Sequence, residues 1–334
     1  MEELFPASYI VVDMVELLKT VNLKKYFPVK SGFLSKPIYI RAVDDVNISI
    51  KPSEVVALVG ESGSGKTTLG RVMIGLMKPD SGNVFFKGKD IYKLKGREYI
   101  EARHKLQIIF QNPDSSINPR MQVVDVIGEA IKELNPKLSS REILDEVLRL
   151  LETVALSPDH IYKYPHELSG GEKQRVVIAR VIAVKPEVIV ADEPTSALDI
   201  SIRSQILNLL MDLQKAIGIS LIFITHDLGI VWSISDRVAI MYMGKIVELS
   251  ETEEIFSNPL HPYTKMLIAS SPSTPIKITD PTFKPRGEPP SLINPPRGCI
   301  FITRCPIATE KCLINSPPLI EASRNHYVAC IRNN

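Results

Sequence analysis

One short segment combines glycines with a lysine and two threonines in a spacing that suits phosphate binding. It follows the apolar run Val55–Val59 and reads Gly60-Glu61-Ser62-Gly63-Ser64-Gly65-Lys66-Thr67-Thr68. Glycines let the backbone wrap closely around an anion, and the N–H groups of a following helix N-terminus point at it. In this pattern the lysine reaches the β- and γ-phosphates, and the hydroxyl after it ligates Mg²⁺. We therefore predict a nucleoside triphosphate site here, with Lys66 as a catalytic residue and Thr67 as a magnesium ligand.

Two carboxylates follow a second apolar run, Val188–Ala191, at Asp192 and Glu193. Ligands of open parallel sheets bind at the carboxyl ends of the strands, which is where these side chains would lie. Asp192 is expected to hold Mg²⁺ through its water shell, and Glu193 to polarise the attacking water as general base. Alone, such a pair is usually a solvated strand end, so its meaning depends on the phosphate-binding loop before it.

A third motif, Leu168-Ser169-Gly170-Gly171-Glu172, precedes a helical pattern at Val176–Val184. A serine hydroxyl and two glycines at a helix N-terminus form a further anion site. The motif resembles the LSGGQ signature of the ATP-binding cassette (ABC) family, with Glu172 in place of the commoner glutamine. We expect Ser169, Gly170, Gly171 and Glu172 to bind nucleotide.

Other elements of the same family occur in the family's order. Gln111 matches the loop that ligates Mg²⁺ and senses the membrane partner, the segment 196–199 matches the D-loop, and His226 matches the switch histidine near the γ-phosphate. The resemblance implies an α/β P-loop NTPase fold, namely an ABC nucleotide-binding domain with a RecA-like core, an antiparallel β subdomain and a helical subdomain. It also implies ATPase activity with Glu193, His226 and Lys66 as the catalytic residues.

The number of motifs bears on assembly, because in this family the signature of one chain caps the phosphate bound by another. The sequence has one P-loop and one signature. We therefore expect a dimer with a second ABC ATPase subunit, and the sequence leaves open whether that subunit is identical or a paralogue. Family members also stack adenine on an aromatic residue. Position favours Phe27, with Tyr26 and Tyr39 as alternatives because residues 28–40 form an insertion.

Three further segments resemble the ATPase subunits of dipeptide/oligopeptide importers, and more specifically the second of their two paralogous ATPases. They are 116–121, 261–264 and 294–299, and the resemblance covers residues about 17 to 330. It implies two transmembrane permease subunits as partners, an indirect link to an extracytoplasmic peptide-binding protein, and a peripheral position at the cytoplasmic face of the membrane. Residues 1–13 lie outside the resemblance, and Met14 is an alternative start.

Composition limits the rival functions. The 334 residues are 44% hydrophobic and 23% charged, and 40 Lys and Arg against 38 Asp and Glu leave a net charge of +2. This is the composition of a globular protein, and it does not suggest a nucleic-acid partner, whose binding domain would be strongly basic. No apolar run approaches the roughly 20 residues that cross a bilayer. The rivals that remain are a nickel or oligosaccharide importer ATPase and a soluble cassette ATPase acting on nucleic acid or ribosomes.

Proline content predicts the domain division, since 11 of the 25 prolines fall between Pro272 and Pro318. Proline removes a backbone donor, so this stretch cannot be a long helix or a central strand. The prolines mark the start of a small C-terminal appendage at 269–334. The family resemblance implies the other divisions, an N-terminal extension at 1–16 and an ATPase domain at 17–268 with its helical subdomain at about 112–168. Within the body we expect strands at 55–59, 187–191 and 219–225, a helix at 201–217 and a hairpin at 238–249.

All four cysteines lie in the last 36 residues, at Cys299, Cys305, Cys312 and Cys330. Four thiols suffice for a [4Fe–4S] cluster or a Cys₄ zinc site, although the spacing is wider than in zinc knuckles or bacterial ferredoxins. Related importer ATPases carry a similar tail whose cysteines hold an iron–sulfur cluster. The resemblance therefore favours [4Fe–4S], with zinc as the alternative and free thiols or disulfides as further ones.

Overall fold

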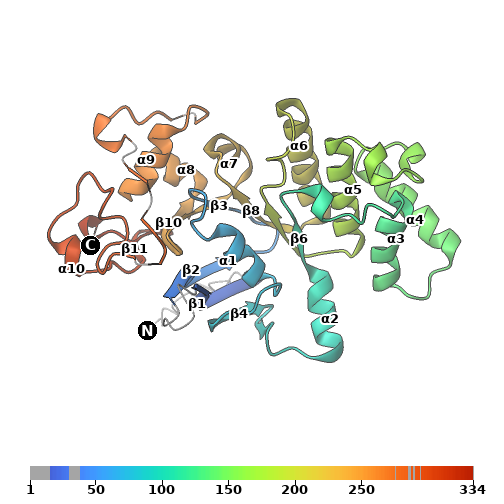
Figure 1. Cartoon of the computed structure of the whole chain (residues 1–334), viewed down its shortest axis with the longest axis horizontal. Coiled ribbons are helices and arrows are strands. Elements are labelled where there is room, and N and C mark those ends of the chain that lie inside the picture. The colour runs from blue at the N-terminus through green and yellow to red at the C-terminus, as the bar shows by residue number, and fades with distance from the viewer. Residues whose placement is uncertain are drawn as a thin grey trace, which may run out of the picture.

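The computed structural model describes residues 16–29, 38–274, 276–284, 287–288, 290–293 and 295–333. Some of the predicted features therefore lie outside the described residues. These are the N-terminal extension except for its last residue, the alternative start at Met14, most of the insertion, and Asn294. Figure 1 shows an elongated arrangement, with a group of helices at one end, the C-terminal tail at the other and the main sheet between them.

The main sheet has eight strands in the order β11-β12-β10-β9-β3-β8-β7-β6. Five neighbouring strands are parallel, and three antiparallel strands extend them at one edge. The parallel strands are β3 (Val55–Val59), β6 (Leu106–Ile109), β7 (Val188–Asp192), β8 (Ser220–Thr225) and β9 (Arg237–Tyr242). The antiparallel strands are β10 (Lys245–Glu251), β11 (Ile320–Ser323) and β12 (His326–Val328). Every residue of β3, β7 and β8 is buried, as expected for parallel strands covered on both faces.

A smaller antiparallel sheet has the order β2-β1-β4-β5. Its strands are β1 (Leu18–Val29), β2 (Ile38–Ile50), β4 (Ser81–Phe86) and β5 (Lys89–Asp90). Helix α1 (Lys66–Met73) contacts β1 and β2 on one side and β7 and β8 on the other, so it lies between the two sheets. Gly70 makes this fit possible, because a Cβ there would lie 2.9 Å from both Val190 and Ile224.

Helices α3 and α4 pack against α5 at the end of the molecule farthest from the tail (Figure 1). Ser139 and Glu142 start α4 with a reciprocal capping box, and Gly218 ends α6 with a φ of 71°. The helices are α2 (Gly96–Lys105), α3 (Val123–Leu134), α4 (Ser140–Thr153), α5 (Gly170–Ala183), α6 (Ile200–Ile217), α7 (Leu228–Ile234), α8 (Thr252–Ser257), α9 (Pro262–Ser270) and α10 (Lys311–Ile314). Short 3-10 turns occupy Pro113–Ser115, Pro158–His160, Pro165–Glu167, Pro281–Phe283 and Ile331–Asn333.

The C-terminal tail is built into the main sheet, which its proline content did not indicate. Strand β12 pairs with β10, and β11 pairs with β12 as the outermost strand. Phe301 is 1% exposed and packs edge-on against Tyr242 of β9, with Tyr263 of α9 beside it. The tail therefore shares a hydrophobic core with the body, because an apolar anchor and two short strands suffice where proline excludes longer elements.

The elements predicted within the body are confirmed with shifts of one or two residues. Strand β3 has the predicted bounds, while β7, β8 and α6 each begin one residue away from their predicted starts. The hairpin is β9 and β10. The predicted domain boundaries stay predictions. Within the described residues, no helix is both long enough and apolar enough to span a bilayer.

Candidate nucleotide site

The glycine-rich loop lies where β3 ends and α1 begins, pressed against neighbouring backbone. A Cβ at Gly60 would lie 2.1 Å from the Met241 carbonyl oxygen. A Cβ at Gly65 would lie 1.9 Å from the Ala42 carbonyl oxygen, and Gly65 has a φ of 106°. Only glycine fits both positions, so the sequence pattern reflects close packing as well as phosphate access. Of the other loop residues, Ser64 is buried, Thr68 is half-buried, and Ser62 and Gly63 are exposed.

Lys66 is 6% exposed and folds back over its own loop. Its Nζ donates hydrogen bonds to the carbonyl oxygens of Gly60 at 2.7 Å and Glu61 at 2.8 Å. Burial lowers the pKa of Lys66, and the nearby carboxylates of Glu193 and Asp192 partly oppose that shift. A third, longer hydrogen bond runs to Ser64 Oγ at 3.4 Å. Because all three acceptors are neutral, the ammonium charge is available to an incoming phosphate.

Thr67 and Asp192, the two side chains expected to hold magnesium, contact each other directly. The Thr67 hydroxyl donates to Asp192 Oδ1 at 2.8 Å, although 125 residues separate the two in sequence. Asp192 is 4% exposed, and burial raises its pKa against the opposing effects of Thr67 and Arg71. A hydroxyl and a carboxylate are oxygen donors of the kind Mg²⁺ prefers, so the pair fits this ion. A bound cation would favour the ionised carboxylate that burial disfavours.

The Glu193 carboxylate is held by a side chain on each oxygen. Gln111 Nε2 donates to Oε2 at 3.0 Å, and His226 Nδ1 lies 3.0 Å from Oε1. Because an ionised carboxylate only accepts, His226 carries its proton on Nδ1 in this contact. The three residues follow the ends of β7, β6 and β8, which are adjacent in the sheet. Glu193 also has a φ of 46°, a left-handed conformation that few non-glycine residues adopt. The structure thus brings Lys66, Thr67, Gln111, Asp192, Glu193 and His226 to one edge of the sheet.

Two hollows adjoin this cluster. One of about 370 Å³ is lined by Gly60, Glu61, His226 and the loop that follows α9. A smaller one of about 80 Å³ lies beside Glu193 and Ser196. The hollows therefore flank the loop and the proposed base, on the side of the sheet where nucleotides bind in open α/β folds.

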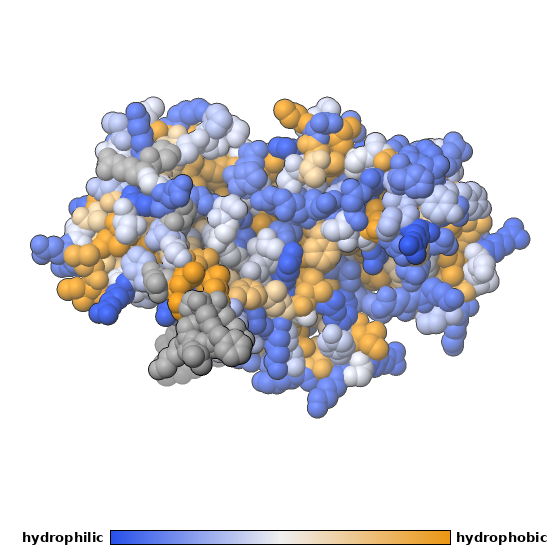
Figure 2. Space-filling view, in the orientation of Figure 1, coloured by the Kyte–Doolittle hydropathy of each residue, from blue (hydrophilic) through white to orange (hydrophobic). Residues whose placement is uncertain are grey.

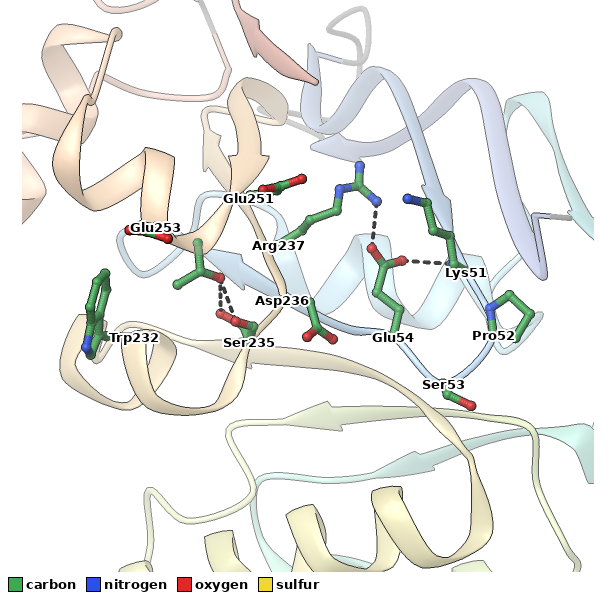
Figure 3. Close-up of a pocket in the computed structure, with 11 residues that line it drawn as sticks. Lys51, Pro52, Ser53, Glu54, Trp232, Ser235, Asp236, Arg237, Glu251 and Glu253 are labelled. Atoms are coloured by element: carbon green, nitrogen blue, oxygen red, sulfur yellow. Dashed lines mark hydrogen bonds and ion pairs between the residues drawn. The ribbon is translucent and has the colours of Figure 1, made fainter. Parts of the chain in front are cut away.

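A larger hollow of about 1060 Å³ lies at the opposite ends of the strands. Figure 3 shows its lining, in which Glu54 accepts from the Lys51 backbone and from Arg237, with Trp232 across the opening. Glu54 comes just before β3, whereas the glycine-rich loop comes just after it. We therefore assign the nucleotide to the smaller hollows at the carboxyl ends of the strands, although this hollow is larger.

The signature motif forms a separate site at the start of α5. The Glu172 backbone N–H donates to Ser169 Oγ at 3.3 Å, and Glu172 Oε2 accepts from the Ser169 backbone at 2.7 Å. His160 Nε2 lies 2.9 Å from the other oxygen of Glu172. Hydrogen bonds from Ser169 and His160 lower the pKa of Glu172 to about 2. Glu172 therefore closes a capping box with Ser169. Glutamine, the family's commoner residue, could close the same box, so the substitution keeps the start of the helix.

No hydrogen bond or ion pair of the described residues joins this motif to the glycine-rich loop. Figure 1 shows α5 among the helices at one end and α1 at the centre. Gly171 lies against α6, since a Cβ there would be 2.6 Å from Ile202, and Gly170 lies against Leu198. Within one chain, the signature motif and the glycine-rich loop therefore lie apart from each other.

The aromatic candidates for adenine stacking occupy different settings. The Tyr26 hydroxyl donates to Asp44, and burial together with that bond raises the pKa of Tyr26. Phe27 pairs with Ile40 across the small sheet, with the Lys25 Nζ 5.7 Å from its ring centre. Tyr39, the third candidate, is 49% exposed. These settings do not select one ring, and the stacking of Phe27 on adenine stays a prediction.

The four cysteines share one neighbourhood but do not form a metal-binding set. Burial, together with the charges of the other three cysteines, raises the pKa of the Cys299 thiol to about 11. All four are free, and among the described residues no group of three or more His, Cys, Asp or Glu side chains is placed to hold a metal ion. Burial favours neutral thiols, whereas metal ligation needs thiolates. The geometry therefore supports neither the [4Fe–4S] prediction nor zinc, and it contains no disulfide.

Two residues that sequence reasoning missed touch the glycine-rich loop. The Glu61 backbone N–H donates to the Tyr263 hydroxyl at 3.0 Å, and the Glu61 carboxylate pairs with Arg304. These partners lie 202 and 243 residues further along the chain. The sequence carries no local pattern that links positions so distant, and only the fold, which sets both α9 and the tail against the loop, brings them together.

Comparison with known proteins agrees with this geometry. The family model described as "ABC transporter" matches residues 43–196, and the one described as "Oligopeptide/dipeptide transporter, C-terminal region" matches residues 247–312. The chain is 44% identical to the dipeptide transport ATP-binding protein DppF of Haemophilus influenzae, over 96% of this chain and 98% of that protein. It is 45% identical to the oligopeptide transport ATP-binding protein OppF of Salmonella typhimurium, over 95% and 96%.

Solved structures show the same fold. A dimeric ATP-binding cassette in a post-hydrolysis state, bound to ADP and Pi, matches with a TM-score of 0.62 at 28% identity, covering 70% of this chain and 98% of that one. A component of the cbiONQ ABC transporter complex of Clostridium perfringens matches with a TM-score of 0.61 at 32% identity, covering 73% and 91%. The chain therefore belongs to the ABC transporter family, in the group of dipeptide and oligopeptide transport ATP-binding proteins.

Proposed function

We propose that this chain is the ATP-hydrolysing subunit of a peptide importer. The observation that carries the catalytic part is the Glu193 carboxylate, held on one oxygen by Gln111 and on the other by His226. A carboxylate fixed in this way can orient a water molecule and accept its proton as the water attacks the γ-phosphate. His226, with its proton on Nδ1, keeps Glu193 in position and presents its second ring nitrogen to the reaction centre.

The phosphate and magnesium functions follow from neighbouring residues. Lys66 exchanges its two carbonyl acceptors for phosphate oxygens, which costs little because both acceptors are neutral. Thr67 and Asp192, with Gln111, are the oxygen donors for Mg²⁺. Magnesium, when bound, neutralises the negative charge that develops on the phosphates. Phe27 is our candidate for stacking on the adenine base.

A second ABC ATPase subunit completes the site in this proposal. The signature residues Ser169 to Glu172 have no bond to the glycine-rich loop among the described residues, and the related ADP-bound cassette is described as dimeric. Ser169 and the α5 N-terminus would then face the γ-phosphate held by the partner's loop. We place the dimer at the cytoplasmic face of the membrane, where two permease subunits couple its closure to transport and a peptide-binding protein supplies the cargo outside.

The peptide cargo is inferred from the relatives, whose names include dipeptide and oligopeptide transport, and from the C-terminal region that this chain shares. The test reconstitutes the chain with its permease subunits and binding protein in proteoliposomes and measures ATPase activity against added peptides, nickel or oligosaccharides. We expect stimulation by peptides. Stimulation by nickel or an oligosaccharide alone would reassign the cargo, and stimulation by nucleic acid or ribosomes without permease would overturn the importer assignment. A Lys66→Ala variant should lose ATPase activity in every condition.

A metal centre in the tail is a separate proposal, with a [4Fe–4S] cluster as our choice and zinc as the alternative. The number of thiols and their shared neighbourhood support it, while their present placement does not. Anaerobic purification followed by visible absorbance and by iron, sulfide and zinc analysis tests it. Iron and sulfide in equal amounts would support the cluster. A colourless protein with stoichiometric zinc, or with no metal, would refute it.

A further inference from the structure

Glu61, the second residue of the glycine-rich loop, is held through three of its polar groups. Its carboxylate accepts from both Arg304 Nη1 and Nη2, at 2.8 and 2.9 Å. Its backbone N–H donates to the Tyr263 hydroxyl at 3.0 Å, and its carbonyl accepts from Lys66 Nζ at 2.8 Å. One residue therefore links the catalytic lysine with α9 and with the C-terminal tail.

The Arg304 pair is well built, because two parallel hydrogen bonds fix a guanidinium on a carboxylate in one orientation. The Arg304 side chain is 5% exposed, and that of Glu61 is 28% exposed. The guanidinium carbon lies 5.9 Å from the ring centre of Tyr242, whose ring packs edge-on against Phe301. The hydrogen bonds with Glu61 raise the pKa of Arg304, so the side chain remains cationic. Such a pair resists screening better than the exposed ion pairs elsewhere on the surface.

The charge of Glu61 is unfavourable in a loop that receives a triphosphate. A carboxylate at the rim of the site repels the nucleotide, and the cationic Arg304 paired with that carboxylate offsets the repulsion. We propose that Arg304 is a positioning residue of the nucleotide site: it neutralises and holds Glu61, and so sets the affinity of the loop for MgATP. The inference rests on the proposed ATPase function, and it makes the C-terminal tail part of the ATP site.

The test measures the KM for MgATP and kcat of the full chain in four variants. Arg304→Ala should raise KM about tenfold, which corresponds to about 1.4 kcal/mol, with kcat within about twofold of wild type. Arg304→Lys should give an intermediate KM, since it keeps the charge and loses the two-pronged contact. The double variant Arg304→Ala with Glu61→Gln should return KM to near the wild-type value. The control, Arg324→Ala, removes an exposed arginine of the same tail and should not alter KM.

Rescue by Glu61→Gln separates the electrostatic role from a structural one. If Arg304 only held the tail in place, removing the Glu61 charge would not lower KM again, and a double variant as poor as Arg304→Ala overturns the proposal. An unchanged KM in Arg304→Ala overturns it too. If Arg304→Ala does not fold, Glu61→Gln alone decides: a lower KM supports the proposal and an unchanged or higher KM refutes it. Absence of ATPase activity in the wild-type chain would instead refute the proposed function.

Discussion

The attachment of the tail hairpin to the main sheet depends on one buried carboxylate, and we predict that His326→Ala releases it. Glu248 of β10 and His326 of β12 both have fully buried side chains. The Glu248 carboxylate accepts from His326 Nε2 at 2.8 Å and from the backbone N–H groups of Leu260 at 2.6 Å and His261 at 3.0 Å. Loss of the imidazole leaves a buried carboxylate with fewer donors and a cavity beside it.

The size of the effect follows from these contacts. A hydrogen bond to a charged acceptor contributes about 1.5–3 kcal/mol, and leaving a buried charge without one of its partners costs about 3–5 kcal/mol. Two backbone donors remain on Glu248, so we place the loss near the lower bound, at about 3 kcal/mol. His326→Gln keeps an N–H donor of similar reach and should lose less than half as much.

Urea unfolding followed by circular dichroism measures this loss, and limited proteolysis reports whether the tail is cut first. Arg324→Ala serves as the control, because this exposed residue lies in the turn of the same hairpin. The reasoning is refuted if His326→Ala and Arg324→Ala unfold at the same urea concentration and are cut at the same rate.

Two further predictions concern the loop and the signature. Glu172 has a pKa of about 2, below its ordinary 4.5, so its stabilising effect is complete above pH 4.5 and is lost as the pH falls towards 2. Glu172→Gln should therefore lose about 1 kcal/mol less free energy of unfolding between pH 6 and pH 3 than the wild type. The effect is kept this small because the Glu172 side chain is one-third exposed and screened by solvent. Parallel curves of stability against pH for the two proteins would contradict this prediction. Gly65→Ala should abolish nucleotide binding, because its Cβ would lie 1.9 Å from the Ala42 carbonyl oxygen. A Cβ at Gly63 would have no atom within 4 Å, so Gly63→Ala should retain more binding. Equal loss in both variants, measured with a fluorescent ATP analogue, would argue against the packing explanation.

The individual strands and helices of the body could be predicted from local sequence patterns. The run Val55–Val59 is β-branched and apolar, and it forms a strand with those bounds. The helix at 201–217 was predicted from its spacing and its terminal Gly218, which takes the left-handed conformation that glycine favours. Strand order and the position of α1 between two sheets depend on long-range pairing, which periodicity does not encode.

In the candidate site too, residues within a local motif could be predicted, whereas residues brought in by long-range contacts could not. Thr67, Asp192 and Glu193 were found by motif, and their contacts with one another and with Gln111 follow from strand ends that meet at one sheet edge. Arg304 could not be found in this way, because nothing in the residues around it indicates a contact with a loop 243 residues earlier. The cysteine pattern was informative about proximity but not about ligation, since number and spacing do not fix side-chain direction.

The central claim is that Glu193 acts as the base in an otherwise intact ATP site, and Glu193→Gln tests it most directly. Single-turnover hydrolysis of radiolabelled MgATP and equilibrium binding are measured on the same preparation, with gel filtration to follow the dimer. We predict MgATP binding close to that of wild type, hydrolysis slower by at least about a hundredfold, and a dimer that persists with ATP bound. Hydrolysis at the wild-type rate, with binding unchanged, would contradict the account.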